Sequence, residues 1–208
     1  MDRKILIVGL ILASVATMAD PAFAHHVMGG SMPVTFVDGL LSGLGHPVIG
    51  LDHFAAVVAV GCLAAAHRAG PALTIGFILA MIAGVAVHVR GTTFPGAEIM
   101  VALSVIFLGV ILLRKHQITV GAAFGLFIAV GLLHGYVLGE SIYGAEASPL
   151  TAYFIGLAVI QSAVALAALV ATRAVTQRQA DVLTLRLIGA GIAGIGLAIL
   201  IQQVIPVV

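Results

Sequence analysis

Six long apolar stretches constrain this chain more than any other feature of its sequence. They lie at residues 47–66, 71–89, 97–113, 118–138, 149–172 and 184–205. A helix needs about 20 apolar residues to cross the hydrocarbon core of a bilayer, and each stretch comes close to that length. The chain is 62% hydrophobic and 8% charged, whereas soluble domains carry about 25% charged residues. The sequence therefore predicts an all-α integral membrane protein built as a six-helix bundle.

The first 24 residues have the pattern of a secretory signal peptide. The basic pair Arg3-Lys4 precedes an apolar run over residues 5–19, and a small-residue cleavage site follows at 22–24. We expect this signal peptide to be cleaved, so that residues 25–208 form a single transmembrane domain. An uncleaved additional helix is the alternative, although the run is short for a span.

A further apolar segment, at residues 34–44, precedes the first predicted span. It is too short to cross the bilayer, and non-helical backbone at membrane depth must be covered by protein or line a cavity. We therefore predict a short periplasmic or re-entrant segment here.

Basic residues fall mostly on one side of the predicted membrane domain. If the mature N-terminus is periplasmic, the cytoplasmic connections carry Arg68, Arg114, Lys115, Arg173, Arg178 and Arg186. The external connections carry Arg90. Because cytoplasmic loops are enriched in Lys and Arg, we expect a multi-pass protein of the bacterial inner (cytoplasmic) membrane with both mature termini in the periplasm. The formal net charge of +1, without a basic run, excludes nucleic-acid binding.

Three side chains with metal-ligand chemistry, His46, Asp52 and His53, lie at the start of the first predicted span. Ionisable groups are costly inside a membrane and indicate function there. In a straight helix the two imidazoles share a face but lie about 10 Å apart along the axis, too far for both to bind one ion at about 2.0–2.1 Å. Either the helix breaks at Pro47 or Gly50, so that His46 folds over the start of the span and approaches His53, or the two histidines belong to different sites.

Asp52 has two functional interpretations, as a metal ligand or as the acceptor that fixes the tautomer of a ligating histidine. The alternative is a structural role, in which its carboxylate caps or bridges helices.

Other spans contribute polar residues on the same predicted side. Glu98 begins the third span, and His134 and Glu140 lie at the end of the fourth. We predict that His134 joins the metal site and that the two glutamates assist capture, because an acidic rim concentrates cations. Helix packing by His134 and ordinary solvation of the glutamates are the alternatives.

The mature chain would begin with His25 and His26, followed by Met28 and Met32. A terminal amine beside an imidazole can chelate a borderline or soft cation, so both histidines are candidate metal ligands. A flexible polar tail is the alternative.

These motifs resemble those of the HupE/UreJ family of hydrogenase and urease accessory membrane proteins, over essentially the whole chain. The matching elements are Ala24-His25, His46-Pro47-x-x-Gly50-x-Asp52-His53, Glu98-Ile99-x-x-Ala102-Leu103-Ser104 and His134-Gly135-x-x-x-Gly139-Glu140. The resemblance implies a nickel or cobalt permease with a cleaved signal and six transmembrane helices. Many members carry extra histidines after the His-Gly pair, where this chain has Tyr136 and Leu138.

We therefore expect a secondary permease that imports a divalent transition metal, Ni²⁺ first and Co²⁺ next. Imidazoles also suit copper and zinc. The alternative is a periplasm-facing protein that binds or delivers a metal such as copper without transporting it. Because the sequence has neither H-E-x-x-H nor G-x-S-x-G, we expect no enzyme and no permanently bound cofactor. The expected partners are the metal ion and the bilayer. The resemblance further implies that the imported metal supplies hydrogenase, urease or cobalamin maturation. A homo-oligomer is compatible with the sequence.

Overall fold

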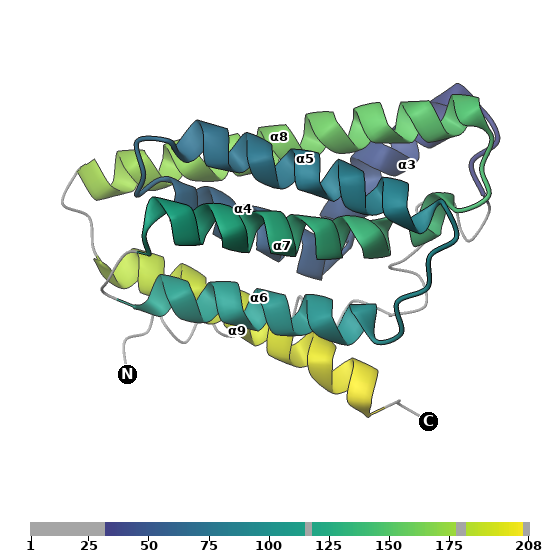
Figure 1. The fold of residues 1–208 in the computed structure, drawn as a ribbon. Coiled ribbons are helices and arrows are strands. Elements are labelled where there is room, and N and C mark those ends of the chain that lie inside the picture. Colours follow the sequence, from purple (N-terminus) through teal and green to yellow (C-terminus); the bar gives the residue numbers. More distant parts are fainter. Residues whose placement is uncertain (1–31, 115–117, 178–181, 206–208) are drawn as a thin grey trace.

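The computed structural model describes residues 32–114, 118–177 and 182–205. In these ranges the chain forms seven α-helices, one short 3₁₀ helix and no strand (Figure 1). The helices are α3 (Phe36–Ile49), α4 (Leu51–Ala64), α5 (Gly70–His88), α6 (Ala97–Leu113), α7 (Val120–Leu138), η1 (Glu140–Ile142), α8 (Ala147–Gln177) and α9 (Val182–Val204). The predicted signal peptide, with His25 and His26, lies outside the described residues.

Four segments are individually long and apolar enough to cross a membrane: Gly70–His88, Val120–Ile142, Ala147–Thr176 and Leu183–Val204. The helix pair α3–α4 passes the same test only when its halves are taken together, and these are bent by 77°. Helix α6 is apolar but shorter, with 17 residues. The chain is thus a multi-pass membrane protein. Its described residues contain four candidate spans, or five if the bent pair counts as one, and they do not confirm the predicted count of six.

The largest correction concerns the first predicted span. We predicted one helix over residues 47–66, preceded by a separate short segment at 34–44. Instead, the earlier segment continues through His46 and Pro47 to the end of α3, and a new helix starts after Gly50. Proline has no backbone N–H, so the helical bond to the Gly43 carbonyl cannot form at Pro47, and the helix ends within one turn.

Local sequence explains where several helices begin. Thr35 and Asp38 form a capping box at the start of α3, in which each side chain accepts the other residue's backbone N–H. Thr119 caps α7 by accepting the backbone N–H of Ala122. Pro71 lies in the first turn of α5, where its missing N–H removes no helical bond.

Helices α5 and α7 run parallel and touch through their backbones. A β-carbon on Gly135 would collide with the carbonyl oxygen of Met81, and one on Gly131 would lie 2.6 Å from that of Phe77. Small residues allow such close approach where lipid provides no hydrophobic drive between helices. This contact fixes the position of His134, which directly precedes Gly135.

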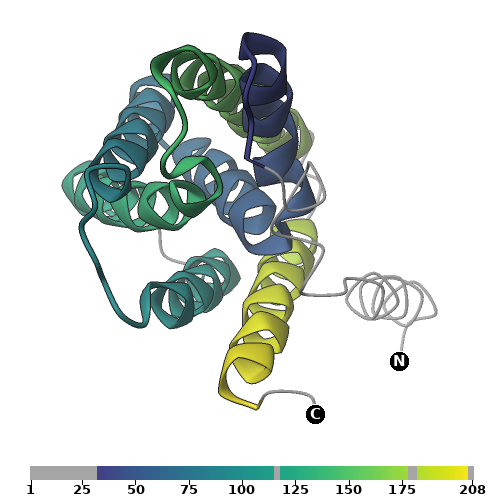
Figure 2. The same cartoon turned by 90° about the vertical axis from the view of Figure 1, so that its right-hand side faces the viewer.

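The bent pair follows α8 along its length. Gly43, on α3, packs against the backbone of Tyr153 and Leu157 in α8. Gly61, on α4, packs against Ala165 of the same helix. The contacts with α8 therefore follow the order of the chain, with α3 against the earlier part of α8 and α4 against a later part. The view along the bundle in Figure 2 shows α4 in the middle of the helices, and most of its side chains are buried.

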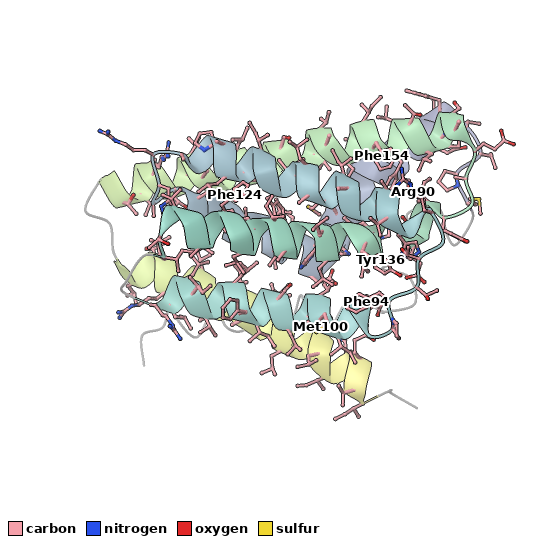
Figure 3. The ribbon with its side chains drawn as sticks, viewed as in Figure 1. Arg90, Phe94, Met100, Phe124, Tyr136 and Phe154 are labelled. Carbon is pink, nitrogen blue, oxygen red and sulfur yellow. The ribbon has the colours of Figure 1, made fainter. Side chains whose placement is uncertain are left out.

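The two ends of the bundle differ in charge. We call the end where α5 and α7 finish and α3, α6 and α8 begin the acidic end. Its charged residues include Asp38, Glu98, Glu140 and Glu146, and Arg90 lies at the same end (Figure 3). The opposite, basic end carries Arg68, Arg114, Arg173 and Arg186. There the Arg173 guanidinium donates to the carbonyls of Ala65 and His67, at 3.2 and 2.7 Å, and so holds the α4–α5 connection against α8.

Candidate functional site

The break at Gly50 brings two predicted site residues towards each other. The Gly50 N–H bonds to the carbonyl of His46, which closes α3, and the Gly50 carbonyl accepts from Phe54 in α4. The ring centroids of His46 and His53 are 6.2 Å apart, and the two side chains are buried, at 4% and 2% exposure. The structure thus has the break that we considered for bringing both histidines to one place, and the break falls at Gly50.

Asp52 lies in the first turn of α4, directly beside this pair. Its Oδ1 atom accepts the backbone N–H of His53 at 2.8 Å and lies 3.9 Å from the Nε2 atom of the same residue. The partial positive charge at a helix N-terminus stabilises a carboxylate in this position. The carboxylate is therefore held next to the imidazole of His53.

His134 reaches the same place from α7. Its Nδ1 atom lies 3.0 Å from Nδ1 of His53, a hydrogen bond between residues 81 positions apart. The two rings meet edge to face with centroids 5.2 Å apart, and His134 is fully buried. His46, Asp52, His53 and His134 together are called the inner cluster below.

Ser104, on α6, completes this arrangement and was not among the predicted site residues. Its hydroxyl lies 2.8 Å from Nε2 of His134 and donates to the carbonyl of Val101 at 2.7 Å. A serine inside an apolar span was the available clue, but serine is a common residue in helix packing. Its role depends on a contact with a helix 30 positions away.

Gln161, on α8, is a second buried polar residue at this depth. It is 1% exposed, and its Nε2 atom has no hydrogen-bond partner among the described residues. Gln161 lies midway between Leu157, which packs against Gly43, and Ala165, which packs against Gly61. This register places Gln161 at the level of the helix break.

The two predicted glutamates do not join the inner cluster. Glu98 and Glu140 line a separate pocket of about 560 Å³ at the acidic end, shared with His88, Tyr136 and Tyr143, which we call the outer pocket. Gln203 of α9 donates a hydrogen bond to the Glu98 carboxylate. Tyr136 and Phe94 lie together in Figure 3, with their ring centroids 6.0 Å apart.

His88 contacts two other residues that line the outer pocket, Tyr136 and Tyr143. Its ring lies 4.6 Å from that of Tyr136 and 5.8 Å from that of Tyr143, measured between centroids. Its Nδ1 atom is buried without a hydrogen-bond partner in the described structure. Tyr136 donates its hydroxyl to the carbonyl of Thr92 and so fixes the loop after α5.

Within residues 32–114, 118–177 and 182–205, no three or more His, Cys, Asp or Glu side chains are arranged as a ready metal site. The inner cluster therefore has donors of the right chemistry without a closed coordination shell. His25 and His26, the other predicted ligands, lie outside these ranges.

Comparison with known proteins agrees with this arrangement of motifs. A family model described as "HupE / UreJ protein" matches residues 12–199. The curated Protein HupE of Rhizobium leguminosarum bv. viciae is 34% identical over 132 residues, which cover 62% of this chain and 66% of that protein, just under two thirds of its length. No solved structure matches this chain. The family match extends over most of the sequence and includes both the helix break and His134, so the chain belongs to the HupE/UreJ family.

Proposed function

We propose that this protein is a secondary permease that imports a divalent transition-metal ion, with Ni²⁺ as the first candidate and Co²⁺ as the second. The ion passes from the periplasm through the bundle to the cytoplasm. On this proposal the inner cluster selects the metal, and the outer pocket captures it. The protein has no enzymatic activity, and the metal is its cargo rather than a resident cofactor.

The observation that carries the proposal is a group of buried histidines and a carboxylate at a break in a membrane helix. Polar side chains at such a depth are expensive and mark ion or proton paths. Broken helices near the bilayer midplane form substrate sites in many secondary transporters, because they place polar groups where a straight helix would offer none. His46 and His53 lie on the two sides of the break at Gly50.

The absence of a closed coordination shell among the described residues suits transport better than storage. A protein that keeps its metal benefits from rigid, complete coordination, whereas a permease must also release the ion. Turning His46 or Asp52 towards His53 would complete a site, and turning it back would open the site again.

The acidic end supplies an entrance on the periplasmic side. Glu98 and Glu140 line the outer pocket, and their charge raises the local concentration of cations. The basic end then faces the cytoplasm, as the positive-inside rule requires. An inward membrane potential favours a dication by about 4–5 kcal/mol at 100 mV, from ~2.3 kcal/mol per charge.

The choice of Ni²⁺ over Co²⁺ rests on the family resemblance, since imidazole and carboxylate ligands suit several divalent metals. The metal would then supply hydrogenase, urease or cobalamin maturation. Residence in the inner membrane follows from the expected signal peptide and the multi-pass structure.

Uptake into proteoliposomes tests the proposal. Purified full-length protein is reconstituted, a potential negative inside is imposed, and entry of radioactive nickel or cobalt is followed with and without competing copper and zinc. We expect saturable entry that depends on the potential and disappears in His53→Ala. Binding of nickel without any entry would favour a metal-binding or delivery protein instead.

A further inference from the structure

A chain of hydrogen bonds connects the backbone of α6 to the inner cluster. The Ser104 hydroxyl donates to the Val101 carbonyl at 2.7 Å. The same hydroxyl oxygen lies 2.8 Å from Nε2 of His134, and Nδ1 of His134 lies 3.0 Å from Nδ1 of His53. The chain thus runs through three helices, α6, α7 and α4.

The direction of each bond follows from counting hydrogens. A hydroxyl has one hydrogen, and a carbonyl oxygen can only accept, so the Ser104 oxygen must accept from His134. His134 therefore carries its hydrogen on Nε2. A neutral imidazole has one N–H, so Nδ1 of His134 is an acceptor and Nδ1 of His53 is the donor. His53 then has its lone pair on Nε2, the atom that lies 3.9 Å from Oδ1 of Asp52.

We infer that Ser104 and His134 are positioning residues that present the Nε2 lone pair of His53 to the metal, and that His134 is not itself a ligand. Both ring nitrogens of His134 are engaged in hydrogen bonds. Ligating histidines are usually held in one tautomer by a hydrogen bond at the other ring nitrogen, and His134 provides that bond for His53. Two donor atoms 3.9 Å apart can both reach an ion at about 2.1 Å, so Asp52 can share it. The inference rests on the proposed metal site and assigns different roles to its members.

The alternative assignment, in which His134 is itself a metal ligand, has a different geometry. If both Nδ1 atoms bound the same ion at about 2.1 Å, their separation of about 3 Å would fit neighbouring corners of an octahedron. In that case His53 would lose the hydrogen that it shares with His134, and the ion would have one more imidazole ligand. The number of imidazoles around the metal therefore distinguishes the two arrangements.

A matched pair of asparagine variants separates these roles. The amide of asparagine reaches about as far as Nδ1 of histidine and has no counterpart of Nε2. His134→Asn therefore keeps an acceptor for His53, and His53→Asn keeps a donor for His134. Each variant of the full-length protein is loaded with Ni²⁺ in detergent, its imidazole ligands are counted by X-ray absorption spectroscopy, and its affinity is measured by calorimetry.

We expect His134→Asn to retain the wild-type number of imidazoles with affinity weakened up to about 10- to 100-fold, the usual effect of removing a supporting hydrogen bond at a metal site. His53→Asn should lose one imidazole. Ser104→Ala should weaken binding in the same way as His134→Asn, and Ser104→Thr, which keeps the hydroxyl, should restore it. Thermal unfolding of each variant checks that the fold is intact.

Loss of one imidazole in His134→Asn would overturn the inference, as would unchanged affinity in Ser104→Ala. These outcomes are distinct from failure of the proposed function. Wild-type protein that binds neither Ni²⁺ nor Co²⁺ would refute the metal site altogether, whereas binding without uptake would refute transport and leave the assignment of roles to be decided by the imidazole count.

Discussion

A β-carbon built on Gly50 would lie 3.0 Å from Cδ2 of His53 and 3.2 Å from Oδ1 of Asp52. Both distances are tighter than ordinary van der Waals contact, so the glycine leaves room for the two side chains of the inner cluster. Its backbone angles, φ −71° and ψ 100°, are accessible to any residue. Space beside His53, rather than backbone conformation, is what requires glycine at the break.

Replacing Gly50 with alanine should therefore damage metal binding more than folding. The new methyl group pushes the His53 ring by a few tenths of an ångström, and such a displacement weakens a ligand set that depends on orientation. We expect roughly tenfold weaker Ni²⁺ binding by calorimetry, the low end of the losses seen when support around a metal site is disturbed. Gly125→Ala, where no atom lies within 4 Å of the added carbon, is the control and should bind normally.

Alanine at His46, Asp52 or His53 should each abolish metal uptake, because each removes a polar group from the inner cluster. Expression and thermal stability should remain sufficient for purification. His67→Ala is the matched control, since His67 is a buried histidine at the basic end whose carbonyl, not its ring, binds Arg173. Wild-type uptake rates in all three cluster variants would refute the site.

The outer pocket should govern capture rather than passage. Glu98→Gln and Glu140→Gln each remove one negative charge, so we expect the KM for uptake to rise roughly 2- to 5-fold per substitution, the effect of a partly solvated charge, with little change in maximal rate. The difference should shrink at high salt, which screens such charges. Glu146→Gln removes the same charge at the same end outside the pocket; an equal rise in KM there would show that the pocket has no special role.

The backbone contact between α5 and α7 should be sensitive to any atom added at Gly135. Gly135→Ala places a methyl group onto the Met81 carbonyl, and overpacking of this kind costs about 1–3 kcal/mol. We expect a lower unfolding temperature in detergent. Gly121→Ala, on the same helix with open space around it, should not destabilise the protein; equal destabilisation by both variants would contradict the contact.

The orientation of the bundle can be measured by cysteine labelling. Cys62 is the one cysteine of the chain and is buried, so Cys62→Ala gives a background for single exposed cysteines. In intact cells, Glu146→Cys at the acidic end should react with a membrane-impermeant maleimide, whereas Arg68→Cys at the basic end should react only after permeabilisation. The reverse pattern would place the acidic end in the cytoplasm.

The sequence predicted those features that depend on neighbouring residues. Apolar runs indicated the helices, and the spacing of His46 and His53 made a break between them one of two interpretations. Other features depend on contacts between distant segments. Helix α3 is held in place by α8, which contacts it at Gly39 and Gly43. The hydrogen bond between Ser104 and His134 likewise joins two helices, α6 and α7. Glu98 and Glu140 share a pocket instead of meeting the inner cluster, because α6 and α7 carry them to the end of the bundle.

The bent pair α3–α4 also affects how the protein is made. Neither half, with 14 residues each, is long enough to cross the bilayer alone, and the pair packs along α8, which leaves the ribosome much later. At translation rates of about 5–20 residues per second, the 81 residues that separate His53 from His134 take roughly 4–16 s to synthesise. A nascent chain therefore carries His46 and His53 into the membrane before their partners exist, and the inner cluster can form only after α7 has been made.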